Sequence, residues 1–189
     1  MALDINSMFA DGMISLCDTM SLSSMTIKDI LNKTTLSRQA FYNHFRDKND
    51  LIHWIYDNRI LGHFADEKYF DRYYENTLLY YSNIAKYHRF MKQAVQMTGQ
   101  NCLSEHMIEF SIEYDKRLYE RLSGMSPLPP ELAFASEYHS RATINSCIAW
   151  ILSDMPFPPE TMAKNMVTLR DINLGQTILG DGTRFHLSE

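Results

Sequence analysis

The stretch from Thr26 to Leu51 constrains the fold of this chain most, because it carries three helix-start signals in close succession. Thr26 followed by Asp29 has the form of a capping box, in which a threonine hydroxyl caps a backbone amide and a carboxylate three residues later bonds back to the cap. Ser37 and Asp47 are further residues of the type that caps helices. The stretch therefore predicts three consecutive helices separated by short turns.

The first of these helices has a single apolar face. Ile27, Ile30 and Leu31 fall on that face at helical spacing. The run from Asn32 to Thr35 is polar and is poor helix interior, so we expect the helix to give way to a turn there.

The second predicted helix, after Ser37, separates an apolar face from a polar one. Ala40, Phe41 and Phe45 would pack inward, with Leu36 leading in. The opposite face holds two pairs four residues apart, whose side chains can contact phosphates or base edges: Arg38 with Tyr42, and Gln39 with Asn43. A helix, a short turn and a second helix with a polar outer face form a helix-turn-helix, which places the second helix in the major groove of DNA.

The run T-I-x-D-I…T-L-S-R-Q-A-F-Y-N-H-F-R-D-K-N-D-L resembles the DNA-binding domain of TetR-type transcriptional regulators. Its hallmark is a threonine-initiated helix, a recognition helix that ends in Tyr-x-His-Phe, and a lysine that opens the connecting helix. The resemblance covers residues 5–60. Phe-Tyr-Asn-His-Phe followed by Leu-Ile-x-Trp-Ile looks most like the subgroup of activators of dihydroxyacetone kinase operons.

The sequence departs from the family pattern at the turn. Thr35 stands where a glycine is usual, Leu31 stands where a small residue is usual, and no glycine follows the first helix. These departures concern the geometry of the turn.

The resemblance implies roles for individual residues. The residues that would contact or orient backbone phosphates are Thr26, Tyr42, His44 and Lys48. The residues placed to read bases are Arg38, Gln39 and Asn43. The predicted DNA-binding residues are Thr26, Lys28, Ser37, Arg38, Gln39, Tyr42, Asn43, His44 and Lys48. The alternative is an ordinary helix pair of a bundle, in which Tyr42 or His44 is packed and hydrogen-bonded without touching DNA.

The charge distribution supports DNA binding although the net charge is −5. Between Thr26 and Lys48 the net charge is +3, and the remainder carries −8. Screening limits the reach of the distant negative charge to about 10 Å, so a local basic patch is sufficient for phosphate binding.

Composition and spacing predict an all-α protein. The hydrophobic content is 45%, with 7 glycines and 6 prolines. We expect a three-helix helix-turn-helix DNA-binding domain in residues 1–62 and a helical bundle for ligand or partner sensing and dimerisation in residues 63–189. Beyond the helix-turn-helix, helices are expected at residues 3–20, 69–87, 89–97, 103–122, 131–154 and 160–178, with a frayed tail at 180–189.

The three cysteines, Cys17, Cys102 and Cys147, are widely separated and lack metal-ligand spacing. We interpret them as buried thiols in a reducing compartment, with redox sensing as the alternative. No signal peptide and no apolar run of membrane-spanning length is found, so a cytoplasmic protein without membrane contact, metal or cofactor is expected.

Small residues along 131–154 would allow close helix approach, and the resemblance implies that the last two long helices form a four-helix bundle with a second subunit. The alternative is a contact within one chain. A homodimer would read a palindromic operator. The predicted interface residues are Ala135, Ala142, Ser146, Trp150, Met166 and Leu169.

Aromatic, methionine and histidine side chains of the second region could line an effector pocket. The alternative is that these side chains form an ordinary hydrophobic core. If a partner protein brings the regulatory signal instead of a small molecule, we expect a closed core without a pocket. The candidates are Tyr74, Tyr81, His106, Phe110, Tyr114 and His139, with Tyr73 and Met107 beside them.

Two rival functions remain. Cys102 and His106 lie four residues apart and are a minimal thiol–imidazole pair for nucleophilic catalysis, but no phosphate loop, metal cluster or cofactor turn accompanies them. The second rival function, after catalysis, is a helical scaffold that binds protein partners. The sequence favours a DNA-binding transcriptional regulator that is not an enzyme, and it leaves open whether the protein represses or activates.

Overall fold

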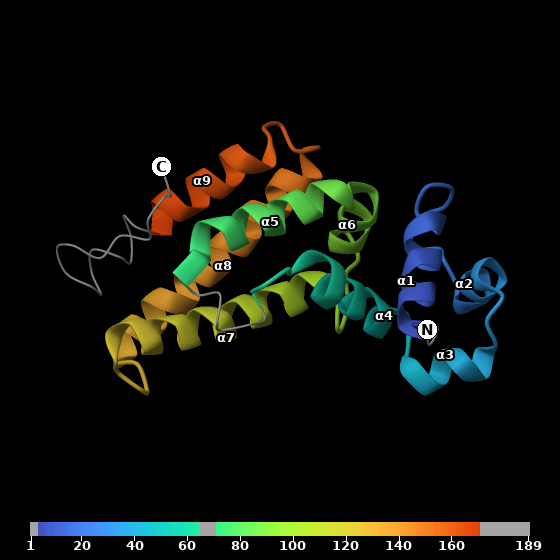
Figure 1. The fold of residues 1–189 in the computed structure, drawn as a ribbon, viewed down its shortest axis with the longest axis horizontal. Coiled ribbons are helices and arrows are strands. Elements are labelled where there is room, and N and C mark those ends of the chain that lie inside the picture. Colours follow the sequence, from blue (N-terminus) through green and yellow to red (C-terminus); the bar gives the residue numbers. More distant parts are fainter. Residues whose placement is uncertain (1–3, 65–70, 171–189) are drawn as a thin grey trace.

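The computed structural model describes residues 4–64 and 71–170, and within these ranges every regular element is helical (Figure 1). The helices α1 to α3 lie together at one end, α4 leads away from them, and α5 to α9 form the rest of the body. The elements are α1 Ile5–Leu16, α2 Ile27–Thr34, α3 Arg38–His44, α4 Lys48–Ile55, the π-helical η1 Tyr56–Ile60, α5 Tyr73–Lys86, α6 His88–Val95, α7 Leu103–Ser123, α8 Pro130–Leu152 and α9 Pro159–Arg170.

The three predicted caps are confirmed. The Thr26 hydroxyl accepts a hydrogen bond from the Asp29 amide at 3.3 Å, and the Thr26 amide donates to the Asp29 carboxylate at 2.8 Å. Ser37 caps α3 and Asp47 caps α4 in the same way, through bonds of 3.0 and 2.9 Å to amides three residues on. Local side-chain chemistry thus sets where each helix begins.

The predicted turn from Asn32 is wrong, because α2 continues to Thr34. The Thr34 hydroxyl donates to the Ile30 carbonyl at 2.9 Å, so this polar side chain bonds to the helix instead of interrupting it. The chain leaves the helix at Thr35, which takes the left-handed conformation with φ 58°. This conformation costs a branched residue about 1–2 kcal/mol, and it explains why glycine is usual there.

Other helix boundaries in the structure differ from the predicted ones by a few residues. α1 ends at Leu16 rather than near residue 20, α5 begins at Tyr73, and α8 ends at Leu152, before the positive-φ residues Asp154 and Met155. The expected extension of the last helix to residue 178 and the frayed tail at 180–189 lie outside the described residues.

One buried cluster runs from the helix-turn-helix into the body. Phe9 of α1 meets Phe41 of α3 edge to face at 5.3 Å between ring centroids. The cluster continues through Ile55 of α4 to Tyr81 of α5, so α4 packs on both sides. The division at residue 62 stays a prediction, because this core is continuous. Within the same described residues no helix has the length and apolar character needed to cross a membrane.

Close contact between α1 and α2 depends on Gly12, which is buried. A Cβ added at Gly12 would clash with the Thr34 methyl group Cγ2. Thr34 is held by its hydrogen bond to Ile30, so this methyl has little freedom to turn away.

We expect Gly12→Ala to lower the free energy of unfolding. Overpacking costs about 1–3 kcal/mol and the better helix propensity of alanine returns up to about 1, so the net loss is on the order of 1 kcal/mol. Urea denaturation would measure it. The double variant Gly12→Ala with Thr34→Ser removes the clashing methyl and should recover most of the loss; no recovery would contradict the assignment of the clash.

Candidate DNA-binding surface and effector cavity

The outer face of α3 is polar and exposed. Arg38, Gln39, Tyr42, Asn43 and His44 are all exposed, as the sequence predicted for a recognition surface. The Arg38 guanidinium lies 5.5 Å from the centre of the Tyr42 ring. Tyr42 is 46% exposed, and its ring packs edge to face on buried Phe41 at 5.5 Å. The outer face of α3 is therefore accessible to a binding partner, while Phe41 anchors the helix in the core.

The two helix starts near this face also expose their predicted residues. Thr26 and Lys28 are exposed at the start of α2, and Ser37 is exposed at the start of α3. The Thr26 and Ser37 hydroxyls already accept the capping bonds of their own helices. Each hydroxyl thus satisfies a backbone amide at the start of its own helix.

Lys48 is half-buried and differs from the other predicted DNA-binding residues. Its ammonium donates to the carbonyls of Leu22, Ser23 and Met25 at 2.8, 3.3 and 2.8 Å. Burial lowers the pKa of Lys48. The side chain ties the start of α4 to the turn that precedes Thr26, so it orients the threonine end of α2.

His106, a predicted pocket residue, lies against α4 instead. Its ring stacks on His53 with centroids 4.2 Å apart, and its Nε2 is 2.8 Å from the Asp57 carboxylate. Burial, with the neighbouring His106, lowers the pKa of His53. The Nε2 of His106 is therefore already paired with the Asp57 carboxylate. No cluster of three metal-binding side chains occurs in residues 4–64 and 71–170.

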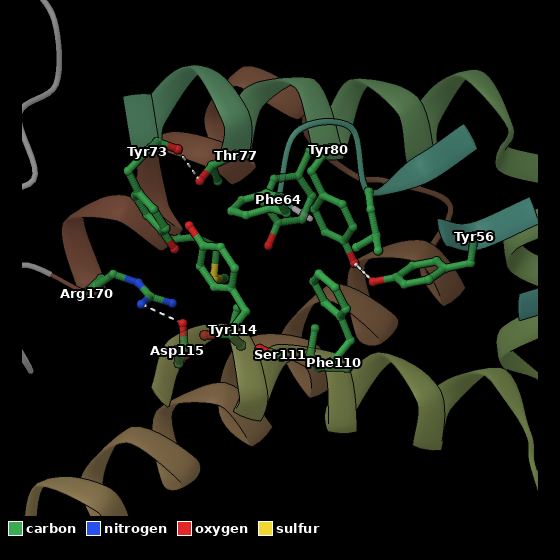
Figure 2. Close-up of a pocket in the computed structure, with 15 residues that line it drawn as sticks. Tyr56, Phe64, Tyr73, Thr77, Tyr80, Phe110, Ser111, Tyr114, Asp115 and Arg170 are labelled. Atoms are coloured by element: carbon green, nitrogen blue, oxygen red, sulfur yellow. Dashed lines mark hydrogen bonds and ion pairs between the residues drawn. The ribbon is translucent and has the colours of Figure 1, made fainter. Parts of the chain in front are cut away.

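A small cavity lies in the body, lined by residues of η1, α5, α7, α8, α9 and the segment that follows η1 (Figure 2). Its volume is about 50 Å³. The lining residues are Tyr56, Leu61, Phe64, Tyr73, Thr77, Tyr80, Tyr81, Phe110, Ser111, Tyr114, Asp115, Thr143, Ile144, Met166 and Arg170.

One end of the cavity is charged. Arg170 of α9 and Asp115 of α7, both almost fully buried, form an ion pair at 2.8 Å. Ser140 donates to Asp115 at 2.6 Å, and Arg170 donates to the Tyr119 hydroxyl at 2.8 Å. Burial alone would lower the pKa of Arg170, but the neighbouring Asp115 raises it well above its usual value. The guanidinium is therefore charged, and within the described residues the Asp115 carboxylate balances it.

The other end is aromatic. Phe64 packs edge to face on Tyr114 at 5.0 Å and on Tyr80 at 5.8 Å, and Figure 2 shows its ring between them. The Tyr80 hydroxyl is 3.0 Å from that of Tyr56. Burial raises the pKa of both hydroxyls, so these tyrosines are neutral.

Three of the six predicted pocket residues, Tyr81, Phe110 and Tyr114, line this cavity. His139 is 8% exposed and Tyr74 is half-buried, and neither is among the lining residues. Sequence reasoning missed Phe64, Asp115 and Arg170. A charged residue inside a helix usually faces solvent, so no local sequence signal distinguished Arg170 and Asp115 from ordinary surface charges.

Exposed apolar side chains occur on both α8 and α9. Phe134 and Tyr138 are 75% and 70% exposed, and Leu169 is 46% exposed. Of the predicted interface residues, Ala142, Ser146 and Leu169 are exposed and Ala135 and Met166 are half-buried. Trp150 is 3% exposed and donates to the Phe157 carbonyl at 3.0 Å, so it packs mainly within its own chain.

Comparison with known families matches the C-terminal part of the chain. Residues 71–171 match the family model TetR_C_8, described as the C-terminal region of transcriptional regulators. This segment is more than half of the chain and lies outside the region that carried the sequence resemblance. No curated protein sequence matches the chain.

Several solved structures share the fold. The dihydroxyacetone kinase operon activator DhaS is 16% identical with a TM-score of 0.68, over 89% of this chain and 94% of that one. NalD, the secondary repressor of the MexAB-OprM multidrug efflux pump in Pseudomonas aeruginosa, is 17% identical with a TM-score of 0.62, over 89% and 95%. TylP, a TetR regulator from Streptomyces fradiae, is 15% identical with a TM-score of 0.60, over 92% and 86%. At these identities the likeness establishes the fold.

His139 gives a test of the packing beside the ion pair. Burial, with the nearby Arg170 charge, lowers the pKa of His139 to about 4. As the pH falls from about 6.5 towards 4, the unfolded chain binds a proton at this residue that the folded chain does not, so stability falls. The loss is on the order of 3 kcal/mol.

We expect His139→Gln to remove that part of the pH dependence, because glutamine stays neutral. Urea denaturation at pH 7 and pH 5 would measure the difference for both proteins. At pH 7 the histidine is neutral in the folded chain, so the comparison there isolates the packing cost of the substitution. An equal loss between the two pH values in variant and wild type would contradict a buried, neutral His139.

Proposed function

The chain belongs to the TetR family of transcriptional regulators, and we propose that it binds a palindromic DNA operator as a homodimer through α3. The observation that supports this most is the face of α3, where five exposed polar side chains project from a helix that buried Phe41 anchors. A short helix presented in this way fits the major groove of DNA.

We assign the base contacts to Arg38, Gln39 and Asn43, whose side chains carry the donors and acceptors that pair with base edges. Thr26, Lys28, Ser37, Tyr42 and His44 would contact phosphates, and Lys48 would hold the turn that positions them. The local charge of +3 suits this role.

The outer face of α8 and α9 is the proposed dimer surface. Large exposed apolar side chains on two adjacent helices, such as Phe134, Tyr138 and Leu169, are costly to leave in water and mark interaction sites. A second copy that presents the same face would form a two-fold interface, with Ala142 and Ser146 allowing close approach. This arrangement gives the two copies of α3 that a palindrome requires.

We propose that residues 1–62 bind DNA and that residues 63–189 sense a small-molecule effector or a co-regulator protein and dimerise. The fold neighbours include an activator, DhaS, and a repressor, NalD. The sign of regulation for this chain depends on where its operator lies relative to a promoter.

Selection from a randomised duplex pool tests the function directly. We expect a palindrome to be enriched, with affinity that falls steeply as salt rises, because bound cations are released from the phosphates. A protein that enriches no sequence at low salt would contradict the proposal.

Variants of α2 and α3 separate base reading from phosphate binding. We expect Arg38→Ala and Gln39→Ala each to weaken binding to the enriched site by about 1–3 kcal/mol, while nonspecific binding changes little. Lys28→Ala should weaken both kinds of binding and reduce the salt slope by about 1. Fluorescence anisotropy at two salt concentrations measures both effects. Lys116→Ala, at an exposed position of α7, is the matched control and should change neither.

Charge placed on the dimer surface tests the assembly. We expect Phe134→Asp and Tyr138→Asp to yield monomers at micromolar concentration, because a carboxylate cannot be buried unpaired in an apolar interface. Analytical ultracentrifugation measures the mass. Met125→Asp is the control, since Met125 is 38% exposed in the loop before α8. A wild-type monomer, or dimers that survive both α8 substitutions, would exclude this surface.

A further inference from the structure

The cavity in the body is too small for an aromatic ligand as it stands. Its volume is about 50 Å³, whereas a dry engineered cavity that holds benzene measures about 150 Å³. A ligand that carries a ring must therefore displace a side chain that now fills the space.

Phe64 is the lining side chain best placed to move. Most of the other lining residues belong to the packed helices, whereas Phe64 follows η1 outside any helix. Gly62 makes the turn that leads to it, with φ +62°, and a Cβ there would lie 2.9 Å from Leu79 of α5. The Phe64 ring sits among Tyr73, Tyr80 and Tyr114, where a ligand ring would find the same edge-to-face partners.

Arg170 specifies the polar part of such a ligand. Its Nη1 is paired with Asp115 and Tyr119, but its buried Nε has no hydrogen-bond partner among the described residues. A buried donor without a partner is costly, so an acceptor brought by a ligand would be favoured. The charge of Arg170 is already balanced by Asp115. A ligand carboxylate would lie close to the Asp115 carboxylate, which disfavours anions, and a cation would be repelled by Arg170.

We propose that the cavity binds a neutral, single-ring aromatic compound with a carbonyl or hydroxyl acceptor, whose ring replaces that of Phe64 and whose acceptor bonds to Arg170. The proposal rests on the proposed function, since it names the effector that would act on DNA binding. Figure 2 shows Phe64 in the middle of this space and Arg170 at its edge.

The position of Phe64 in the chain explains how ligand binding in the cavity would affect the DNA-binding surface. The residue follows η1, which continues α4, and Tyr56 of η1 lines the same cavity. Expelling Phe64 displaces the end of this segment, so the ligand prefers one placement of α4 over another. Only such a difference in affinity can alter DNA binding.

Titration calorimetry with three matched probes tests the ligand class. Acetophenone carries the ring and a carbonyl, cumene replaces the carbonyl with an apolar branch, and benzoate carries a charge. We expect acetophenone to bind at least about tenfold more tightly than either of the others, because it alone satisfies the Arg170 donor without adding charge.

Phe64→Ala tests the displacement. Removal of the ring leaves the space open, so we expect acetophenone to bind this variant at least about tenfold more tightly than wild type. Phe64→Leu, which keeps an apolar side chain, should give a smaller gain and serves if the alanine variant does not fold. Phe157→Ala deletes the same side chain outside the cavity and should leave probe affinity unchanged.

DNA binding distinguishes the possible failures. In wild type, saturating acetophenone should change the affinity for the enriched duplex at least about fivefold, and in Phe64→Ala this coupling should be lost. Equal probe affinity in wild type and Phe64→Ala, or cumene or benzoate binding as tightly as acetophenone, would overturn the inference while selective DNA binding stands. Probe binding that follows the expected pattern in a protein without selective DNA binding would instead overturn the proposed function.

Discussion

The placement of α4 governs the rest of this molecule, because α4 packs against both the helix-turn-helix and the body. Its side chains Leu51 and Ile55 belong to the buried cluster that also holds Phe41 below the recognition surface. Directly after α4, the hydroxyl of Tyr56 in η1 lies within hydrogen-bonding distance of the Tyr80 hydroxyl, and both are buried. A buried pair of this kind contributes about 1 kcal/mol when made and costs more when one partner is removed. The segment from α4 to Tyr56 therefore packs both against the residues that support α3 and against the wall of the cavity.

Local chemistry explains what the sequence could predict. The caps at Thr26, Ser37 and Asp47 each act within three residues, so their pattern is readable without knowledge of the fold. The exposed face of α3 followed from helical spacing alone. The end of α2 did not, because the Thr34 hydroxyl bonds to its own helix and the strained Thr35 takes the place of a glycine. The polar composition of residues 32–35 could not show that the helix continues to Thr34 instead of turning at Asn32.

Contacts between distant helices explain what the sequence could not predict. Arg170 and Asp115 are charged residues on different helices, and the packing of α9 against α5 lets the Arg170 side chain reach Asp115 of α7 in a buried place. His106 and His139 had the same pattern as pocket residues, but the fold turns one towards α4 and buries the other away from the cavity lining. Aromatic residues at helical spacing indicated the right region, but only three of the six predicted residues line the cavity, because core and pocket residues share that spacing.

The buried ion pair favours a ligand-binding role over a purely structural one. Desolvation of two charges consumes most of the attraction between them, so apolar residues of similar volume would give equal or greater stability. Arg170 and Asp115 nevertheless lie on the wall of a cavity, and the Nε donor of Arg170 has no hydrogen-bond partner in the part of the chain that the structure describes. A polar pair in that position adds directional hydrogen bonding to a space that aromatic rings otherwise fill, which is the composition of sites that select one ligand among others of similar size. The same pair joins α7 to α9, so a ligand that engages it also acts on the helix that forms part of the proposed dimer surface.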